Sequence, residues 1–339
     1  MFCKRVYRFF SLAVMLSFSI LNASGQETAA FKGKMPAWKI IEVTNEPEKR
    51  EDCGFVEADG KFYLLGGRGI KPVEVFDPST KEWVKKKSTP FEMHHFQAVA
   101  FKHKIYVVGG MTGGFPHEKP LENLWIYDPS TDQWEKGAEI PSNRRRGSGG
   151  AVVFNNRIYL VCGITDGHFE GTVDWLDEFD PLTQEWTKLE NAPHPRDHFH
   201  AAIVDNNLYL AGGRRTLFKT LDLVGLTEPV VDIFDFKTQL WRSLPQEDSL
   251  PVGRAGCTAV AFKGKLVVLG GESKYQEGSH REVDALDIRT QIWKSFPPLV
   301  IGRHDTQAII YKNKIYIVAG SAKRGGGPDQ SSIESLEIR

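Results

Sequence analysis

Arginine recurs at one position of a segment that appears six times along the chain. Five copies carry arginine there, and the second copy carries Met93. A guanidinium group pairs with a carboxylate or a phosphate through two hydrogen bonds. If the copies are arranged around an axis, these groups form a ring that can hold an anionic ligand. The five residues are Arg50, Arg146, Arg196, Arg254 and Arg303.

Further basic side chains follow in the loops after the first, fourth and sixth segments, and Arg68 and Arg214 join the predicted ligand-binding set. A second interpretation of the repeated arginine stays open at this point. Each one could pair with an acid of the neighbouring copy and bind no ligand. The loops also carry Glu272, Glu277 and Asp329, which would offset part of the positive charge.

Two and four residues after the arginine position, the side chains are polar or small in every copy. Alternation along a strand sends both positions to the same face, which we expect to be the wall of a wet, polar channel. The first layer is Asp52, His95, Ser148, His198, Gly256 and Asp305. The second layer is Gly54, Gln97, Gly150, His200, Thr258 and Gln307.

Several of these side chains are suited to proton transfer, since histidine titrates near neutral pH and carboxylates accept protons. The candidate catalytic residues are His95, His198, His304, Asp52, Asp197 and Asp305, and His200 is a candidate ligand-binding residue. His198 and His200 lie on one side of a strand, an arrangement that also suits a metal ion. Histidine pairs along a polar wall more often bind only water, so we predict no metal and no cofactor.

The repeated segment itself indicates two strands joined by a tight turn. Each copy holds an apolar run, a polar turn and a second run that ends in glycine. In five copies an aspartate then begins another turn, and a tryptophan follows six residues later, as in 75–83 and 126–134. Four strands per copy are therefore expected.

The Gly-Gly pair with the downstream Tyr/Phe-Asp and Trp resembles the kelch repeat over residues 35–339. The resemblance implies an all-β fold, a six-bladed kelch β-propeller. The last copy has no tryptophan strand after Leu336, whereas Trp38 has no unit before it. We therefore expect the N-terminal strand around Trp38 to complete the last blade and close the ring, which removes exposed strand edges. Residues 26–339 form a single propeller domain in this interpretation.

The resemblance also bears on the arginines and on one loop. In kelch proteins that bind acidic peptides, arginines at this repeat position contact the ligand carboxylates, which implies the same role for the five here. The loop 214–231 is long and apolar. It is expected either to fold over the mouth of the channel as a lid or to pack as a small cluster on that face.

Cysteine usage does not indicate a disulfide framework, because Cys53, Cys162 and Cys257 are an odd number after residue 25. Cys53 and Cys257 share one offset in blades that are not neighbours, and alternation points both away from the channel. We expect small buried thiols.

Residues 1–25 have the features of a signal peptide. Lys4, Arg5 and Arg8 precede the apolar run Phe9–Leu21, and Ala23-Ser24-Gly25 follows it. The run of 13 residues is shorter than the ~20 that span a bilayer. We therefore expect a secreted or periplasmic protein with no membrane span. Removal of the segment leaves 40 basic and 43 acidic side chains, a balance that argues against a nucleic-acid partner.

The predicted function is an exported, monomeric and non-catalytic propeller that binds an anionic small ligand, glycan or acidic peptide at an arginine-lined mouth. The alternative is an isomerase, a mutarotase or epimerase of a carboxylated sugar such as sialic acid. Exported bacterial six-bladed kelch propellers include enzymes of the N-acetylneuraminate epimerase kind, and these need an arginine and acid–base groups. No segment matches that family specifically beyond the kelch repeats, so whether the chain is an enzyme stays open.

Overall fold

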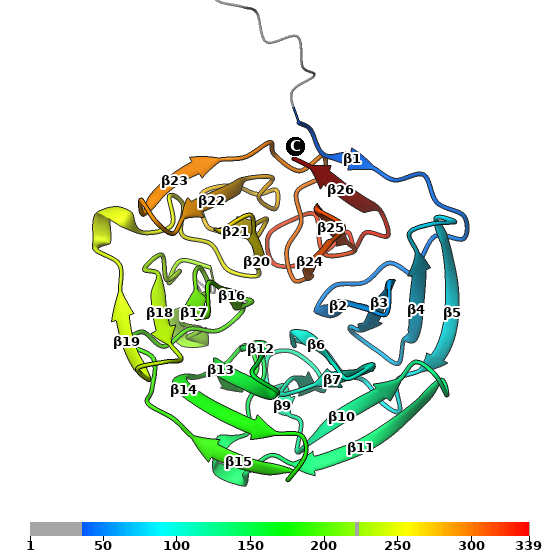
Figure 1. Cartoon of the computed structure of the whole chain (residues 1–339), viewed down its shortest axis with the longest axis horizontal. Helices are drawn as coiled ribbons and strands as arrows, with labels where there is room; N and C mark the ends of the chain where they lie inside the picture. The colour runs from blue at the N-terminus through cyan, green and yellow to red at the C-terminus, as the bar shows by residue number, and fades with distance from the viewer. Residues whose placement is uncertain (1–35, 221–223, 339) are drawn as a thin grey trace, which may run out of the picture. The chain divides into compact units, whose positions relative to one another are not determined.

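The computed structural model describes residues 36–220 and 224–338, and the expected signal peptide, residues 1–25, lies outside them. Pro36–Arg339 is one compact unit. Its strands form six four-stranded antiparallel blades around a central axis (Figure 1), as the kelch resemblance predicted. No helix among the described residues has the length and apolarity needed to cross a membrane.

Blades 1 to 5 run outward from the axis in chain order, and in blade 6 the N-terminal strand takes the outermost place. Blade 1 is β2 (Cys53–Ala58), β3 (Lys61–Gly66), β4 (Pro72–Asp77) and β5 (Glu82–Ser88). Blade 2 is β6 (Ala98–Phe101), β7 (Lys104–Val107), β10 (Asn123–Asp128) and β11 (Gln133–Glu139). Blade 3 is β12 (Gly150–Phe154), β13 (Arg157–Asp166), β14 (Glu170–Asp180) and β15 (Glu185–Lys188).

The second half of the ring repeats this plan. Blade 4 is β16 (Ala202–Val204), β17 (Asn207–Leu210), β18 (Asp232–Asp235) and β19 (Leu240–Ser243). Blade 5 is β20 (Thr258–Phe262), β21 (Lys265–Leu269), β22 (Val283–Asp287) and β23 (Ile292–Ser295). Blade 6 is β24 (Ala308–Tyr311), β25 (Lys314–Val318), β26 (Ile333–Glu337) and β1 (Lys39–Ile40).

A few short elements lie outside the blades. The strands β8 (Met111–Thr112) and β9 (Lys119–Pro120) pair with each other in a loop of blade 2. The described 3-10 helices are Ser142–Arg144, Phe218–Thr220 and Gln246–Asp248. These insertions break the repeat, so each one gives its blade a different loop.

The innermost hairpins share one turn geometry. Both residues of each two-residue turn have φ between 44° and 80°, which defines a type I′ turn and matches the twist of the flanking strands. The six turns are Asp59-Gly60, Lys102-His103, Asn155-Asn156, Asp205-Asn206, Lys263-Gly264 and Lys312-Asn313.

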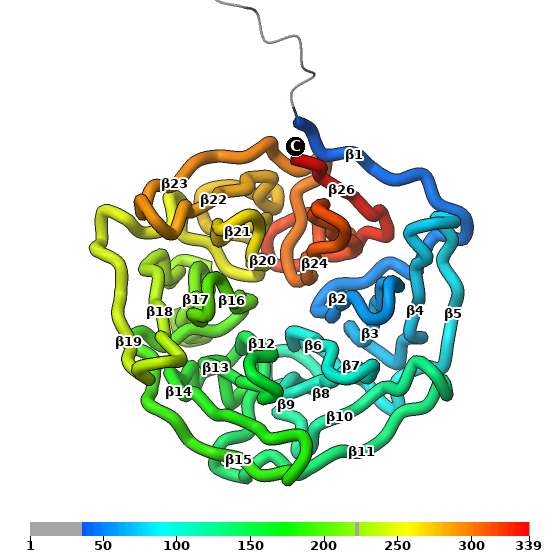
Figure 2. The backbone as a smooth tube through the Cα atoms, viewed as in Figure 1, coloured from blue at the N-terminus to red at the C-terminus, as the bar shows by residue number. Residues whose placement is uncertain are grey.

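The ring closes through the N-terminal strand, as the sequence predicted. β1 pairs with β26 in the register Lys39↔Ser335 and Ile40↔Glu334, and the two strands lie side by side at the rim in Figure 2. Trp38 is buried against Val260 and Leu336 in the apolar cluster between blades 5 and 6. Clusters of this kind, one between each pair of neighbouring blades, form the core of the described residues.

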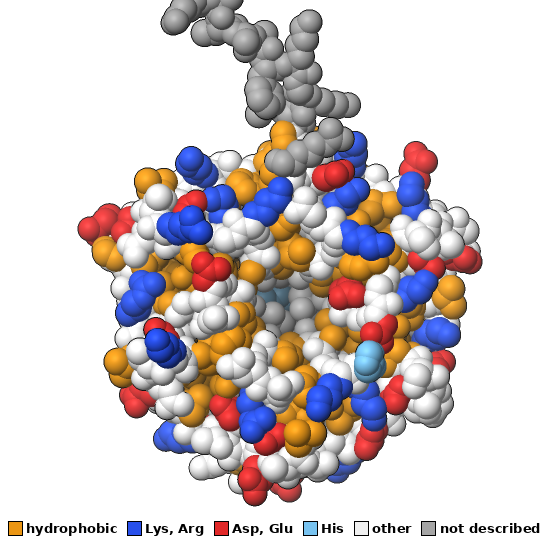
Figure 3. Space-filling model, in the orientation of Figure 1, with side chains coloured by type: hydrophobic (Ala, Val, Ile, Leu, Met, Phe, Trp, Pro, Cys, Tyr) orange, Lys and Arg blue, Asp and Glu red, His pale blue; other side chains and the backbone are white. Residues whose placement is uncertain are grey.

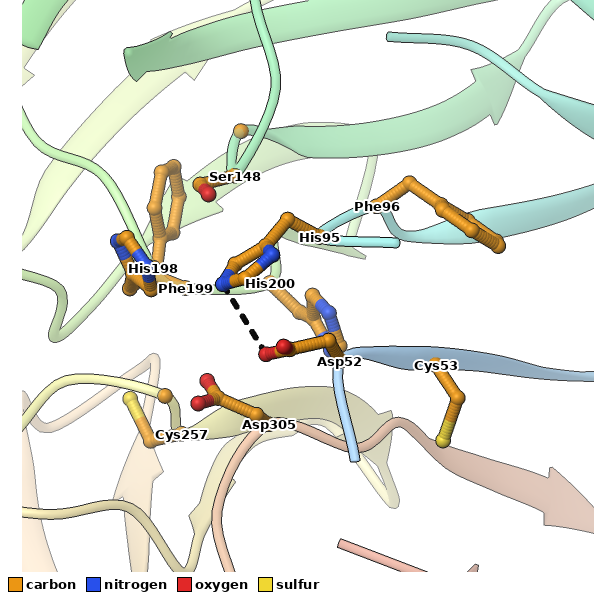
Figure 4. A pocket seen from close by; sticks show the side chains of 12 residues that line it. Asp52, Cys53, His95, Phe96, Ser148, His198, Phe199, His200, Cys257 and Asp305 are labelled. Atoms are coloured by element: carbon orange, nitrogen blue, oxygen red, sulfur yellow. Dashed lines mark ion pairs between the residues drawn. The ribbon is translucent and has the colours of Figure 1, made fainter. Parts of the chain in front are cut away.

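The three cysteines of the propeller are buried and free. Burial raises the pKa of Cys53 and of Cys162 to about 12. Figure 4 shows Cys53 and Cys257 pointing away from the centre of the channel. The prediction of small buried thiols without a disulfide is confirmed for these residues.

Candidate functional site

A shared backbone conformation directs the side chains of the first-layer residues into the channel. Each has a left-handed conformation, with φ between 52° and 61°, just before the innermost strand of its blade begins. The amide of His95 donates to the carbonyl of Asp52, Ser148 to His95 and His198 to Ser148, and the chain continues to Gly256 and Asp305. This series of backbone hydrogen bonds around the channel holds the side chains toward the axis, as Figure 4 shows for Asp52, His95, His198 and Asp305.

Two connected hollows lie at this end of the channel. The deeper one has a volume of about 20 Å³, room for roughly one water molecule. The outer one opens at the mouth with a volume of about 380 Å³, in the range of small-molecule pockets. Asp52 and Asp305 line both. The outer hollow is also lined by Glu51, Arg68, Phe115, His168, Arg214, Val224, Glu272, His304, Gly325 and Gly326.

The candidate acid–base residues are brought together here. Nδ1 of His198 lies 2.6 Å from Oδ1 of Asp197. Nε2 of His95 lies 3.0 Å from Oδ1 of Asp52, the pair marked in Figure 4. Nε2 of His304 lies 3.3 Å from Asp305. All six predicted side chains therefore gather at one end of the channel.

Burial is the main cause of the pKa shifts of His95, His198 and Asp305. It lowers the pKa of His198 to about 4 and holds the pKa of His95 well below its usual value. It also raises the pKa of Asp305 well above the ordinary aspartate value, and the charge of Asp52 adds to that effect. His95 and His198 are therefore neutral at pH 7, and Asp305 favours its protonated form.

Glu51 and Glu272 are shifted in opposite directions. Burial and the charge of Asp52 raise the pKa of Glu51 to about 7. Burial acts the same way on Glu272, but His304 and Arg214 outweigh it and lower its pKa to about 2. The mouth thus holds one glutamate that titrates near neutral pH and one that stays ionised.

The predicted ring of arginines at the mouth is wrong. Arg50, Arg146, Arg196, Arg254 and Arg303 are at most 1% exposed, and each guanidinium lies inside its own blade. There it pairs with an acid of the third strand: Glu74, Asp177, Asp232, Asp284 and Glu334, respectively. The second interpretation, in which each arginine forms a structural ion pair, agrees better with the structure. It differs in one respect, because the acid belongs to the same blade and not to a neighbouring one. A ligand in the channel cannot reach these side chains.

Other members of the predicted binding set occupy different places. Arg68 lies at the mouth with its side chain 31% exposed and donates to Asp52 and Glu118. Arg214 also lines the mouth but is buried, and it pairs with Glu272 at 2.6 Å. His200 lies below the mouth, where its Nδ1 is 3.1 Å from the hydroxyl of Thr258. Arg68 is therefore the accessible cation of the set.

Comparison with known proteins agrees with this architecture. The family model described as Attractin/LZTR1 β-propeller matches residues 18–273. The chain belongs to this family of β-propellers. The kelch motif model matches residues 253–300, so the protein is a kelch-repeat propeller.

Named relatives are kelch proteins as well. The chain is 28% identical over 285 residues to Kelch-like protein terF of Aspergillus terreus, covering 80% of this chain and 58% of that protein. It is 22% identical to human Kelch-like protein 23, covering 81% and 46%. The structure of YjhT aligns with a TM-score of 0.70 at 17% identity, covering 88% of this chain and all of that one. The chain spans about half the length of the first two relatives. The kelch propeller is generally a protein-binding scaffold.

The kelch channel is polar at one end only, which corrects the expectation of a wet channel throughout. The third layer along the innermost strands is apolar: Val56, Val99, Val152, Ala202, Val260 and Ile309. Figure 3 shows hydrophobic side chains around a central hollow of the ring. The repeat predicted the first two layers correctly, but the polar pattern ends there.

Two glutamines form a floor between the polar and apolar ends. The carbonyl of Gln97 accepts from the amides of Ala151 and Ala201. The carbonyl of Gln307 accepts from the amides of Phe55 and Ala98. With His200, Thr258 and the amide of Ala308, these bonds connect all six blades across the channel.

Several site residues were not predicted from the sequence. His168 reaches the mouth from the turn between β13 and β14, and Glu118 from the loop of β8 and β9. Both lie in insertions that have no counterpart in the other blades, so no repeat offset marks them. Glu51 lies at a repeat position beside the predicted Asp52, and this proximity was the available signal.

The long loop of blade 4 contributes to the mouth in its described part. Phe218 lies 5.7 Å from Phe169 and 6.0 Å from Phe115, measured between ring centroids. Val224 lines the outer hollow. The loop therefore packs against aromatic side chains of two other blades at the edge of the mouth.

Replacing Glu51 with glutamine is expected to raise stability more at pH 8 than at pH 5. A carboxyl with a raised folded-state pKa binds more protons folded than unfolded, so its contribution declines as pH rises from its unfolded value toward about 7. Urea unfolding of both proteins at the two pH values measures the difference. The histidines are common to both proteins, so their titration cancels. An equal effect of the substitution at both pH values would contradict this assignment.

Proposed function

We propose that the protein is an exported, non-catalytic kelch propeller that binds a small ligand with hydroxyl groups and one anionic group at the polar mouth. Export rests on the features of residues 1–25. The ligand class covers the end of an acidic glycan and an acidic peptide side chain. The observation that carries the proposal is the hollow of about 380 Å³ to which all six blades contribute.

Arg68 supports a single anionic group in the ligand. Its Nε donates to Asp52 and its Nη2 to Glu118, both at 2.8 Å, and Nη1 takes part in neither bond. A partly exposed guanidinium with free donors suits a ligand carboxylate. Arg214 is buried, and its Nη1 and Nε donate to Glu272 and Thr216. Arg68 is therefore the partly exposed cation of the predicted set at the mouth, in place of a ring of five.

The acids of the mouth support hydroxyl groups elsewhere in the ligand. Oε2 of Glu51 is buried without a hydrogen-bond partner, and such an atom is costly unless a donor reaches it. Asp305 lines the same hollow with its pKa raised, so it can donate as well as accept. A ligand with several carboxylates would meet these acids unfavourably.

Replacing Arg68 with alanine is expected to weaken binding of a carboxylated sugar by about 10- to 100-fold, the loss of a charge-assisted hydrogen bond. Saturation-transfer NMR measures sugar binding by the variant and by the wild type. Galacturonic acid and galactose are compared because they differ in the carboxylate, and sialic acid is tested as a second carboxylated sugar. Arg157→Ala is the matched control, since Arg157 also bonds two acids and its side chain is 34% exposed, but it lies at the start of β13. Equal binding of the acid and the neutral sugar would contradict the role of Arg68. Binding of no sugar would favour a protein partner.

A second candidate function, isomerisation of a carboxylated sugar, is favoured by the titration of Glu51 near pH 7 in the open hollow. The same NMR experiment separates the two functions. Accelerated exchange between anomers of sialic acid that is lost in Glu51→Gln supports the isomerase, and binding without exchange supports the binding module.

A further inference from the structure

Three histidines from different blades converge where the two hollows meet. His95 belongs to blade 2, His168 to blade 3 and His198 to blade 4. Their ring centroids are 4.8 to 5.0 Å apart. One ring nitrogen from each lies within 4.8 Å of the others. The cluster therefore offers three imidazole nitrogens to one point in space.

In two of the rings, a carboxylate fixes the position of the proton. Nδ1 of His198 lies 2.6 Å from Asp197, and Nδ1 of His168 lies 2.9 Å from Glu118. An ionised carboxylate only accepts, so each Nδ1 carries the hydrogen. Each Nε2 is then a free lone pair. A histidine that donates its other N–H to a carboxylate is the usual arrangement of a metal ligand in proteins.

The third ring reaches the same state through a relay. Nε2 of His94 lies 3.1 Å from the carbonyl of Gly113, which can only accept, so this nitrogen carries the proton. Nδ1 of neutral His94 is then an acceptor, and Nδ1 of His95, 2.7 Å away, must donate to it. Nε2 of His95 is left as a third free lone pair.

Two of these lone pairs have no partner among the residues that the structure describes. Nε2 of His95 and Nε2 of His198 are buried without a hydrogen bond, and the two side chains are 4% and 1% exposed. Oδ1 of Asp52 lies 3.0 Å from Nε2 of His95 but does not form a hydrogen bond with it. Hydrogen-bond acceptors this close to one another repel unless a cation lies between them. A single proton can bridge only two of these acceptors, whereas a metal ion can bind several.

We propose that the Nε2 atoms of His95, His168 and His198 bind one divalent transition metal ion of the Zn²⁺ type. Imidazole nitrogen is a preferred ligand of these metals, and Asp52 supplies negative charge beside it. Asp197, Glu118 and His94 orient the three rings. His168 also lines the outer hollow, which therefore lies beside the three nitrogens. The inference stands independently of the proposed ligand, because it rests on the histidines and their partners alone.

Isothermal titration calorimetry of the EDTA-treated protein with zinc chloride tests the site. We expect one ion per chain, and at least about 100-fold weaker binding in His168→Gln. His103→Gln is the matched control, since His103 also pairs with an aspartate, Asp59, but is exposed on a hairpin turn. It is expected to bind as the wild type does. Circular dichroism shows whether each variant is folded.

Two further measurements address geometry and orientation. Cobalt(II) bound in place of zinc is expected to show the strong visible absorption of a four-coordinate site. This absorption is expected to be lost in His168→Gln. Glu118→Gln is expected to weaken zinc binding by roughly 10- to 100-fold, because His168 loses its carboxylate. Zinc binding that is absent in the wild type, or unchanged in His168→Gln, would overturn the proposal. Neither result depends on sugar binding, so failure of the proposed function is detected separately.

Discussion

Replacement of Arg254 by alanine is expected to lower the free energy of unfolding by about 3–5 kcal/mol, the usual cost of breaking a buried ion pair. Nη2 of Arg254 lies 2.9 Å from Asp284, and both side chains are buried. Nε and Nη1 also donate to the carbonyls of Gly270 and Val252. The substitution therefore leaves a buried carboxylate without a counter-charge and carbonyls without donors. Urea unfolding measures the loss.

Two controls separate a structural arginine from a binding one. Arg157→Ala removes a partly exposed arginine and is expected to change stability by at most about 1 kcal/mol. The double variant Arg254→Leu/Asp284→Leu removes both charges and is expected to recover most of the stability. If Arg254→Ala unfolded like the wild type and bound sugar more weakly, Arg254 would be a ligand contact and not half of a structural ion pair.

Deletion of residues 26–42 is expected to abolish cooperative unfolding or to cause aggregation. The deletion removes β1 and exposes the edge of β26, which then lacks a partner strand. It also removes Trp38, which is 5% exposed in the cluster between blades 5 and 6. Calorimetry and light scattering of the purified protein measure the effect.

A point substitution tests the same closure without changing the chain length. Trp38→Ala is expected to cost about 3–5 kcal/mol, typical of a large aromatic side chain in a core, and to lower the melting temperature by on the order of 10 °C. Lys39→Ala, in the same strand but exposed, serves as the control. A deletion variant that melts at the wild-type temperature would contradict ring closure by β1.

The blades could be predicted because their physical causes recur in each copy. A two-residue polar turn between apolar runs fixes each inner hairpin. The closing strand was identified because no tryptophan strand follows Leu336 and Trp38 has no unit before it. The long hairpin of β13 and β14 and the pair β8 and β9 could not be predicted, since they occur once. The repeat pattern therefore predicts the strands that recur in every blade but not the insertions that occur once.

The arginines show how a repeat can mislead about function. A fixed offset determines where a backbone position lies, but a long side chain can turn back into its own blade. The acids that receive the guanidiniums also recur, three residues before the aspartate or glutamate that ends the third strand. The second blade has Met93 in place of arginine and Trp125 in place of the acid. That paired exception was a signal in the sequence for an internal ion pair.

The floor made by Gln97 and Gln307 has a consequence for any molecule in the polar mouth. Their side chains hydrogen-bond the blades to one another across the axis. The polar mouth is therefore closed at its inner end and is not one end of an open channel. A long chain cannot thread through it, so only an end or a short branch can be seated. Recognition at this face therefore selects termini over interior segments, and the ligand must leave by the opening through which it entered.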